Sequence, residues 1–452
     1  MYLKSIEISQ IRAIEQFEMT FQEPAGWHVL IGDNGAGKST IVRSTALALL
    51  EPNDMNATRE DWDEWLNQKA TDGYIEVKIT LDQRFESALS GDITASNKII
   101  FSNERIFSEE ENQIWEKVIS PKIITSNVSP IPIWLDNILL LTSHHGSINS
   151  IRTADFPSNR KGAWFSAAYG PYRRFTGGNT EKEKLFNSHP RLGAHLSAFG
   201  EDVALSEALT YLRELYIKKL EKRPEGEVID WLFKFINEAQ LLPHGTKIKE
   251  INSDGIFFTD GNGNTITAVQ MSDGFRSVLS LTFELIRQLI RAYGQDAVFK
   301  DIKGGKMVID LPGVVLIDEI DAHLHPTWQT RIGFWFLQYF PSLQFIVTTH
   351  SPLICRACEK GSIWRLAAPG SQTPSGEVTG TDRDRLIFGN VLDAYGTEAF
   401  GRSVERSQQS KEMLDRLAKL SAINSFGKIS AAEKSELEAL RKILPTDDTT
   451  EF

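Results

Sequence analysis

The sequence predicts an α/β fold with a parallel sheet at its centre, because three apolar runs have the composition of strands buried on both faces. These runs are residues 27–31, MVIDLPGVVLIDEI at 307–320 and LQFIVTTH at 343–350. After the first run, residues 39–50 carry apolar side chains at helical spacing. Alternation of apolar and polar residues over 75–81 predicts a further, half-buried strand.

Length and composition limit the class of protein. The 452 residues suffice for two or three domains. With 49 Lys and Arg against 60 Asp and Glu, the net charge of −11 argues against a surface that coats nucleic acid throughout, although a local basic groove stays open. Two cysteines exclude a disulfide framework. No apolar run reaches the roughly 20 residues of a membrane helix, and the N-terminus lacks a signal-peptide pattern. We therefore expect a cytoplasmic protein with no membrane partner.

Changes of pattern along the chain predict its domain organisation. Residues 83–160 are polar, rich in Ser and Asn and interrupted by Pro, which favours an insertion. Residues 181–240 have a mainly helical pattern, and Asp260-Gly261-Asn262-Gly263 is a hairpin turn sequence. Amphipathic helices are expected around 405–422 and 430–444, after a Gly/Ser/Pro/Thr-rich linker. No heptad run indicates a long coiled coil.

These patterns predict an α/β lobe made from two separated stretches, with an insertion between them and a small helical tail after them. The expected parts are the N-terminal part of the lobe (1–82), the insertion and helical region (83–240), the C-terminal part of the lobe (241–370), and the linker with the helical tail (371–452).

A glycine-rich motif follows the first apolar run. Gly32-Asp33-Asn34-Gly35-Ala36-Gly37-Lys38-Ser39 has the form G-x-x-x-x-G-K-[ST], and its place between a strand and a helix pattern distinguishes a P-loop from a chance glycine-rich turn. Its N–H groups can wrap phosphates, Lys38 can reach the β- and γ-phosphates, and Ser39 offers a hydroxyl to Mg²⁺. The predicted nucleotide contacts are Asn34, Gly35, Ala36, Gly37, Lys38, Ser39 and Thr40.

Two acidic residues end the second apolar run. Asp318 and Glu319 directly follow Val314-Val315-Leu316-Ile317. Phosphoryl transfer depends on positioning and charge stabilisation, so we predict that Asp318 holds Mg²⁺ through water and that the catalytic Glu319 polarises the attacking water. Two acids at the start of a solvated loop are the alternative, which a complete P-loop disfavours. Together the two motifs predict a Mg²⁺-dependent ATPase.

The residues around this acidic pair resemble the SMC, RecF and OLD families of ABC-type ATPases. The run from Asp318 to Pro326, DEIDAHLHP, is similar to their Walker B motif and D-loop, and FIVTTHSP at 345–352 is similar to their switch-histidine strand. The resemblance implies that Asp321 is the D-loop residue and that His350 acts in catalysis at the γ-phosphate. A structural histidine is the alternative for His350.

A third motif, Met271-Ser272-Asp273-Gly274-Phe275-Arg276-Ser277, is similar to the ABC signature and precedes an apolar helix pattern. The resemblance implies that Ser272 and Gly274 bind the nucleotide of the opposite protomer, and hence that the heads form a homodimer or a higher homo-oligomer. The motif departs from LSGGQ, because Asp273 replaces a glycine and Phe275-Arg276 replace its usual end. An ordinary helix capped by Ser272 is the alternative.

Two weaker signals lie elsewhere. Arg12, after the first predicted strand, resembles the N-terminal arginine with which SMC-like heads touch nucleotide, with a surface ion pair as the alternative. No clear Q-loop glutamine is present. The segment AAYGPYRRF at 167–175 is a candidate for that loop, or for a basic patch that contacts a partner.

Three groups of possible metal ligands are discounted. Cys355 and Cys358 form one isolated pair, for which packing is favoured over zinc binding. His323 and His325 lie within the D-loop pattern, where packing or hydrogen bonding is expected. The pair at 144–145 lies in the predicted insertion without the spacing of an H-N-H motif.

The resemblance as a whole implies an α/β fold of the ABC type, a P-loop ATPase like an SMC or RecF head, with a helical insertion and a small C-terminal helical tail. The P-loop and the signature lie about 230 residues apart, and the D-loop lacks the DEP of transporter subunits. With YGPYRRFTGG in the insertion and IDEIDAHLHPTWQ, the chain most resembles the ATPases of Septu-type anti-phage defence, the PtuA family, and their retron relatives.

That resemblance implies a regulatory ATPase that controls a separate HNH nuclease, is not itself a nuclease, and meets DNA through the complex. The alternative is a DNA-repair ATPase of the RecF kind, acting as an ATP-dependent clamp or loader. A neighbouring gene for a small HNH protein would select the first function, and tight ATP-dependent binding to gapped duplex DNA would select the second.

Overall fold

The structure is a computed structural model of the chain. The chain separates into two compact units, Met1–Phe388 and Gly389–Phe452, and each has its own core. The structure describes residues 2–50, 52–58, 60–80, 94–102, 122–124, 133–135, 138–140, 165–173, 190–200, 207–252, 255–371, 374–391, 394, 408–425 and 429–444.

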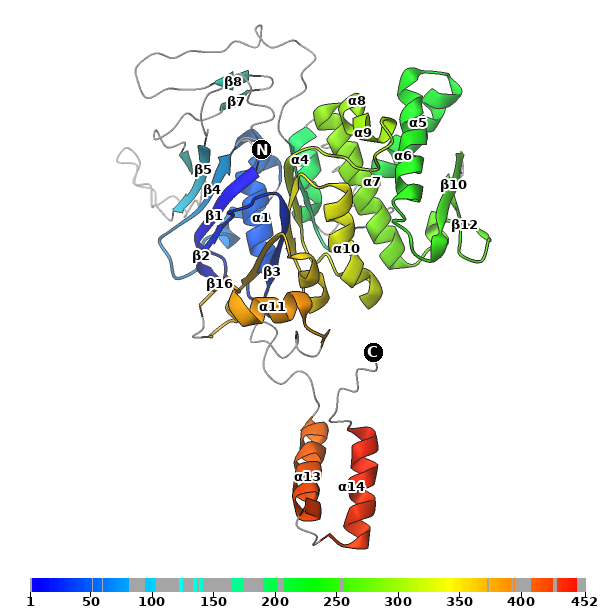
Figure 1. Ribbon diagram of the computed structural model, residues 1–452. Helices are drawn as coiled ribbons and strands as arrows, with labels where there is room; N and C mark the ends of the chain where they lie inside the picture. The colour runs from blue at the N-terminus through cyan, green and yellow to red at the C-terminus, as the bar shows by residue number, and fades with distance from the viewer. Residues whose placement is uncertain are drawn as a thin grey trace, which may run out of the picture. The chain divides into compact units, whose positions relative to one another are not determined.

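A six-stranded sheet forms the centre of the first unit (Figure 1). Its strand order is β16-β15-β3-β14-β13-β9, and every neighbouring pair is parallel except β15 and β16. The strands β3, β13 and β14 are buried along their whole length, which confirms the predicted parallel sheet. The bounds are β3 Gly26–Ile31, β9 Ser166–Tyr169, β13 Gly313–Ile317, β14 Leu343–Thr348, β15 Gly361–Arg365 and β16 Gly376–Glu377.

A second, antiparallel sheet has the order β2-β1-β4-β5-β6. In β4 every second residue is buried, which confirms the alternation that the sequence shows there. The bounds are β1 Tyr2–Ile11, β2 Ile14–Thr20, β4 Asp72–Thr80, β5 Thr94–Ser102 and β6 Lys122–Ile124.

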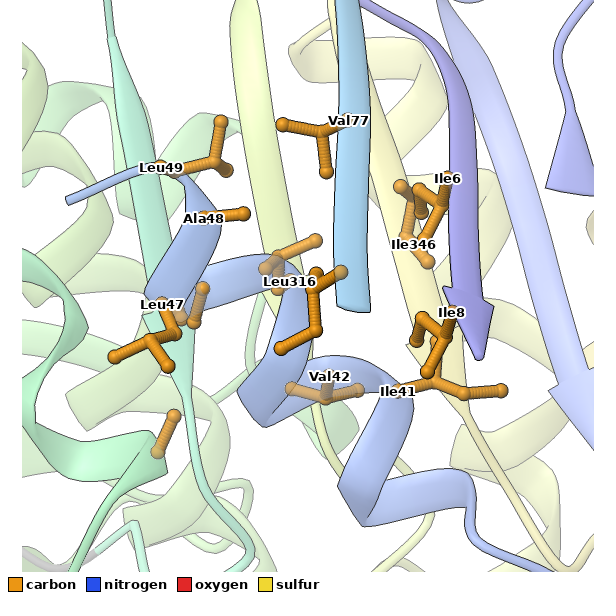
Figure 2. Close-up of a cluster of buried hydrophobic side chains, with 14 of the residues drawn as sticks. Ile6, Ile8, Ile41, Val42, Leu47, Ala48, Leu49, Val77, Leu316 and Ile346 are labelled. Atoms are coloured by element: carbon orange, nitrogen blue, oxygen red, sulfur yellow. The ribbon is translucent and has the colours of Figure 1, made fainter. Parts of the chain in front are cut away.

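The helix α1 (Lys38–Ala48) lies between the two sheets. Figure 2 shows its apolar side chains meeting both sheets. Burial of one such side chain stabilises the fold by about 1.5–3 kcal/mol, so α1 and the loop before it are fixed at the carboxyl end of β3. The contributors labelled there are Ile41, Val42, Leu47 and Ala48 from α1, Leu49 directly after it, Ile6, Ile8 and Val77 from the antiparallel sheet, and Leu316 and Ile346 from the central sheet.

Two helices, α6 (Val228–Glu238) and α10 (Pro326–Tyr339), pack together through aromatic side chains, and α10 contacts the central sheet. Trp335 on α10 contacts Phe235 on α6, and its indole donates to the carbonyl of Ala239 at 2.8 Å. The neighbouring Phe336 stacks on Trp27 of β3. With α5 (Glu207–Leu220), α6 confirms the predicted helical pattern over the described residues 207–240, while 181–189 and 201–206 lie outside the described residues. Figure 1 shows α5, α6 and α7 (Asp273–Tyr293) side by side.

A small antiparallel sheet precedes α7. It has the order β10-β11-β12, and the turn between β11 and β12 is organised by Asp260, whose Oδ1 accepts from the N–H groups of Asn262 at 2.9 Å and Asn264 at 2.7 Å. The hairpin predicted from the turn sequence is confirmed. The bounds are β10 Lys247–Asn252, β11 Gly255–Thr259 and β12 Thr265–Thr267.

The stretch predicted as insertion and helical region contributes three strands to the sheets of the lobe. The strand β5 pairs with β4 along its length, β6 pairs with β5, and β9 pairs with β13 at the edge of the central sheet. The place of β9 depends on pairing with residues that lie far away in the sequence. A helix also lies in the region expected to be a linker, α11 (Gly380–Phe388), and its Leu386 and Ile387 are buried.

The second unit contains a pair of helices, α13 (Gln408–Ser425) and α14 (Ala431–Ile443). Ser430 begins α14 with a capping box that Glu433 completes. The apolar faces of the two helices cover each other, so these side chains are buried within the pair itself. The buried residues are Leu417, Leu420, Leu437, Leu440 and Leu444.

The remaining described elements are short. None of the helices in the described part of the chain is long and apolar enough to cross a bilayer. The short elements are α2 Pro52–Ala57, η1 Trp62–Glu64, β7 Ile133–Leu135, β8 Ile138–Leu140, α4 Pro190–His195, η4 Leu196–Ala198, η5 Pro224–Glu227, η6 Pro243–Gly245, η7 Ala268–Gln270, α8 Gln295–Val298, α9 Lys300–Lys303 and η8 Pro352–Ala357.

Candidate nucleotide site

The glycine-rich loop joins β3 to α1 in the conformation that its glycines permit. Gly35 and Gly37 have φ values of 79° and 97°, in the left-handed region that favours glycine. A Cβ on Gly37 would lie 2.9 Å from Cγ1 of Ile14, so this position also lacks room for a side chain. The loop therefore brings backbone N–H groups to the N-terminus of α1, an arrangement suited to phosphate.

Lys38 turns back into this loop. Its Nζ donates to the carbonyls of Gly32 at 2.7 Å and Asp33 at 3.0 Å, and the side chain is buried. Burial lowers the pKa of Lys38, while the nearby carboxylates, Asp318 and Glu319 first among them, oppose that shift. The ammonium and the acidic pair thus interact across the same end of the sheet. Asn34, Gly35, Ala36 and Ser39 are exposed or half-buried around it, and Thr40 is buried at the start of α1.

Asp318 and Glu319 follow β13, next to β14. Thr348, the last residue of β14, connects them: its hydroxyl donates to Oδ1 of Asp318 at 2.5 Å and accepts from the N–H of Glu319 at 2.7 Å. Asp318 is buried and Glu319 half-buried. Glu319 has a φ of 48°, uncommon for a residue with a side chain, so surrounding contacts must hold it in place.

Thr348 is not among the predicted site residues. Its role depends on the parallel pairing of β13 with β14, which sets Ile317 opposite Val347 and so puts Thr348 beside the acidic pair. A hydroxyl residue at the end of a strand that is buried along its whole length is the one signal that points to it.

The D-loop and the switch segment are joined by the side chain of Asp321. Its Oδ1 accepts from the hydroxyl of Thr349 at 2.6 Å and from the N–H of His350 at 3.4 Å. The side chain of His350 is exposed directly after β14, so it is not the buried structural histidine that was the alternative. The structure therefore brings Asp321 and His350 together beside Asp318 and Glu319.

The signature motif begins α7 against the D-loop. Ser272 occupies the N-cap position and is exposed, but its side chain makes no capping hydrogen bond. A Cβ on Gly274 would lie 2.5 Å from the carbonyl oxygen of His323, so this approach requires glycine. Asp273, which departs from the usual signature, forms an ion pair with Arg276 that offsets its charge at the helix start.

Arg12 forms an ion pair, which was the alternative to a nucleotide contact. Its Nη2 lies 3.0 Å from Oε2 of Glu60, and its guanidinium lies over the ring of Trp65, 4.5 Å from the centroid. A nucleotide contact by Arg12 would require it to leave both partners.

Of the segment proposed as Q-loop or basic patch, residues 167–173 are described. Ala167, Ala168 and Tyr169 belong to β9, and Arg173 is 4% exposed. Arg173 therefore faces the protein interior and is unsuited to a surface patch. Burial lowers its pKa to about 10, and the acids Asp318, Asp321 and Glu319 partly oppose this. The rest of the segment, 174–175, lies outside the described residues.

The described cysteines and histidines that were discounted as metal ligands are buried, cap a helix or are exposed. Cys355 and Cys358 are free thiols with no exposed surface, and burial raises the pKa of both. His325 caps α10, with its Nδ1 accepting from the N–H of Thr327 at 3.4 Å, and His323 is exposed. The histidines at 144–145 lie outside the described residues.

The oxygen donors at the carboxyl end of the sheet fit Mg²⁺. The hydroxyl of Ser39 and the carboxylate of Asp318 are hard ligands of the kind that this ion prefers. Within the described ranges no group of three or more His, Cys, Asp and Glu could hold a metal by itself.

Comparison with known families finds two partial matches. Residues 1–133 match the family described as "AAA ATPase domain", and residues 168–356 match "AAA domain, putative AbiEii toxin, Type IV TA system". Each match covers less than half of the chain, and both are to AAA domains.

Among individual proteins, the chain is similar to the Septu protein PtuA of Bacillus mycoides (strain KBAB4), with 24% identity over 369 residues, covering 80% of this chain and 40% of PtuA. It is also similar to the retron Vc95 probable ATPase of Vibrio cholerae serotype O1 biovar El Tor, at 24% identity over 78% of this chain and 71% of that protein. The retron Ec83 probable ATPase of Escherichia coli is 34% identical over 28% of this chain and 21% of its own length. The chain thus spans well under half the length of the first of these relatives.

Solved SMC heads are among the structural neighbours. The SMC head domain from Thermotoga maritima has a TM-score of 0.41 at 12% identity, covering 84% of this chain and 99% of that one. An Smc head bound to the C-winged helix domain of ScpA has a TM-score of 0.47 at 13% identity, covering 84% and 98%.

Proposed function

We propose that this chain binds Mg·ATP at the P-loop and hydrolyses it with Glu319 as the residue that polarises the attacking water. The observation that carries the proposal is the meeting of Lys38 with Asp318 and Glu319 at the carboxyl end of one parallel sheet, where Lys38 interacts electrostatically with both acids. The matches to two AAA ATPase families support it.

Each residue has a distinct part in the proposed reaction. The loop N–H groups and Lys38 bind the phosphates, and Ser39 with Asp318 would hold Mg²⁺, which neutralises charge on the phosphates when bound. Thr348 orients Asp318 through Oδ1 and Glu319 through its N–H group. His350, which is exposed and whose N–H group lies beside Asp321, would meet the γ-phosphate.

We further propose that a second copy of the chain completes each site with its signature motif, because Ser272 and the start of α7 are exposed. A mixture of Lys38→Ala and Ser272→Arg proteins should then regain activity, since each heterodimer contains about one intact site. Phosphate release by the mixture, beside each variant alone, is the measurement.

Subunit exchange must be shown in the same mixture. Tagged copies of the two variants should co-purify after mixing, and the untreated parent protein sets the full rate. If exchange occurs and the mixture is as inactive as either variant, the shared site is refuted.

We propose that this ATPase is the regulatory subunit of an anti-phage defence complex in which a separate HNH protein cuts DNA. Similarity to a Septu PtuA and to retron ATPases supports an ATPase of such systems. The HNH partner comes from the family resemblance alone. The alternative, a RecF-like clamp, would be favoured by tight ATP-dependent binding of the chain alone to gapped duplex DNA.

The chain alone is expected not to cut DNA. In its described residues no cluster of three acidic, histidine or cysteine side chains is available for a nuclease metal, and the net charge of −11 disfavours a polyanion. The test incubates plasmid with the purified chain, ATP and Mg²⁺ or Mn²⁺, with the co-expressed HNH protein as positive control. Metal-dependent cleavage by the purified chain alone would refute the division of labour.

The helical tail is one possible dock for the partner. Its buried leucines cover one another within α13 and α14, so these leucines do not offer an apolar face to a partner. Deletion of the residues after about 400, followed by co-purification of the HNH protein, decides whether the tail is required.

A further inference from the structure

Arg173 is a buried cation that the proposed reaction does not use. It lies four residues beyond β9, is 4% exposed, and sits between the acidic pair and the signature helix. A buried guanidinium is costly unless its donors are satisfied. Its hydrogen-bond partners therefore indicate what it holds together.

One side of the guanidinium binds the backbone of the acidic pair. Nη1 donates to the carbonyl of Asp318 at 2.7 Å, and Nη2 donates to the carbonyl of Glu319 at 2.8 Å. Nη1 also donates to the carbonyl of Gly170 at 2.8 Å. Because the guanidinium is planar and rigid, two consecutive carbonyls bound to its two ends have a fixed relative orientation.

The contact with the carbonyl of Glu319 holds a residue whose backbone conformation is uncommon. Glu319 has a φ of 48°, and its N–H group is held by Thr348. Arg173 holds the carbonyl of the same residue, so both peptide groups of Glu319 are clamped. The direction of its carboxylate follows from that backbone conformation, since side-chain direction is set at Cα.

The other side of Arg173 reaches the signature helix. Nε donates to Oγ of Ser277 at 3.3 Å, and the carbonyl of Arg173 accepts from Oγ of Ser280 at 3.4 Å. Both serines are buried on α7, within two turns of Ser272. Arg173 is therefore bonded to the backbone of the catalytic acid and to the helix that carries the signature.

We propose that Arg173 is a positioning residue that fixes the carboxylate of Glu319 and connects Glu319 to the signature helix. Occupation of one ATP site would then orient the signature motif that the same chain offers to the other site. The proposal rests on the proposed ATPase function. The proposed role affects the rate of ATP hydrolysis and not the affinity for ATP, because Arg173 donates to the backbone carbonyls of Asp318 and Glu319 and not to the P-loop.

The kinetic test compares Arg173→Gln with Arg287→Gln. Arg287 is a matched control, since it lies on α7, is 10% exposed, and pairs with Glu284 at 2.7 Å. Arg173→Gln should lower kcat about 100-fold, the usual consequence of misplacing a catalytic group by about 1 Å, with the Kd for Mg·ATP within about threefold of the parent. Arg173→Lys, which keeps the charge but not the planar pair of donors, should recover part of kcat. Arg287→Gln should keep the parent kcat.

Amide hydrogen exchange of the nucleotide-free proteins gives a readout that does not depend on turnover. Arg173→Gln should speed exchange at the amides of 318–320 and in the first turns of α7, while Arg287→Gln should leave 318–320 unchanged. If the parent chain fails to hydrolyse ATP, the ATPase proposal fails, and exchange still decides the positioning role. Parent-level kcat in Arg173→Gln, or exchange at 318–320 equal in the two variants, would overturn the inference.

Discussion

Replacement of Lys38 by Ala should lower the affinity for Mg·ATP by about 100-fold or more. Its Nζ lies inside the P-loop, within hydrogen-bond distance of the carbonyls of Gly32 and Asp33, and from there it can turn to the phosphates. Charge-assisted hydrogen bonds contribute about 1.5–3 kcal/mol each, and 1.4 kcal/mol corresponds to tenfold in Kd. Calorimetric titration with ATP in the presence of Mg²⁺ measures the change.

A matched control is Lys303→Ala. Lys303 is a half-exposed lysine on α9 that pairs with Asp296, and its removal should leave the Kd unchanged. If Lys38→Ala binds ATP as tightly as the parent and the control, the loop is not the phosphate site.

Replacement of Glu319 by Gln should leave binding of Mg·ATP intact while lowering the hydrolysis rate by about 100- to 10,000-fold, the range for loss of a general base. The amide keeps the shape of the carboxylate, and the backbone contacts to Thr348 and Arg173 do not depend on its charge. It cannot, however, draw a proton from water. Single-turnover hydrolysis and a parallel titration separate the two effects.

Glu436→Gln controls for the loss of one carboxylate, because Glu436 pairs with Arg416 between the tail helices. That variant should hydrolyse ATP at the parent rate. A near-parental rate in Glu319→Gln would instead show that another group polarises the water.

The parts of the site that lie close together in the sequence could be predicted from it. The P-loop and the acidic pair each combine a buried strand with the residues that directly follow it, so their local pattern carries both the structure and the chemistry. The structure places Lys38 within electrostatic reach of Asp318 and Glu319, as that interpretation requires.

The contacts between distant segments could not be predicted. The strand β9 has only four residues, and its place beside β13 depends on pairing across more than a hundred residues of chain. The segment that contains Arg173 therefore predicts a loop or a basic patch, because nothing in it shows that Arg173 is buried against Asp318 and Glu319. The ion pair of Arg12 with Glu60 likewise joins two segments that are separate in the sequence.

We expect this chain to hydrolyse ATP at the site formed by the P-loop and the acidic pair. Phosphate release from ATP by the purified chain, alone and with any protein that co-purifies with it, tests this expectation beside Lys38→Ala prepared in the same way. Phosphate release should be steady, require Mg²⁺, stop when EDTA is added, and be lost in Lys38→Ala. No release in either preparation, or release that Lys38→Ala retains in full, would contradict it.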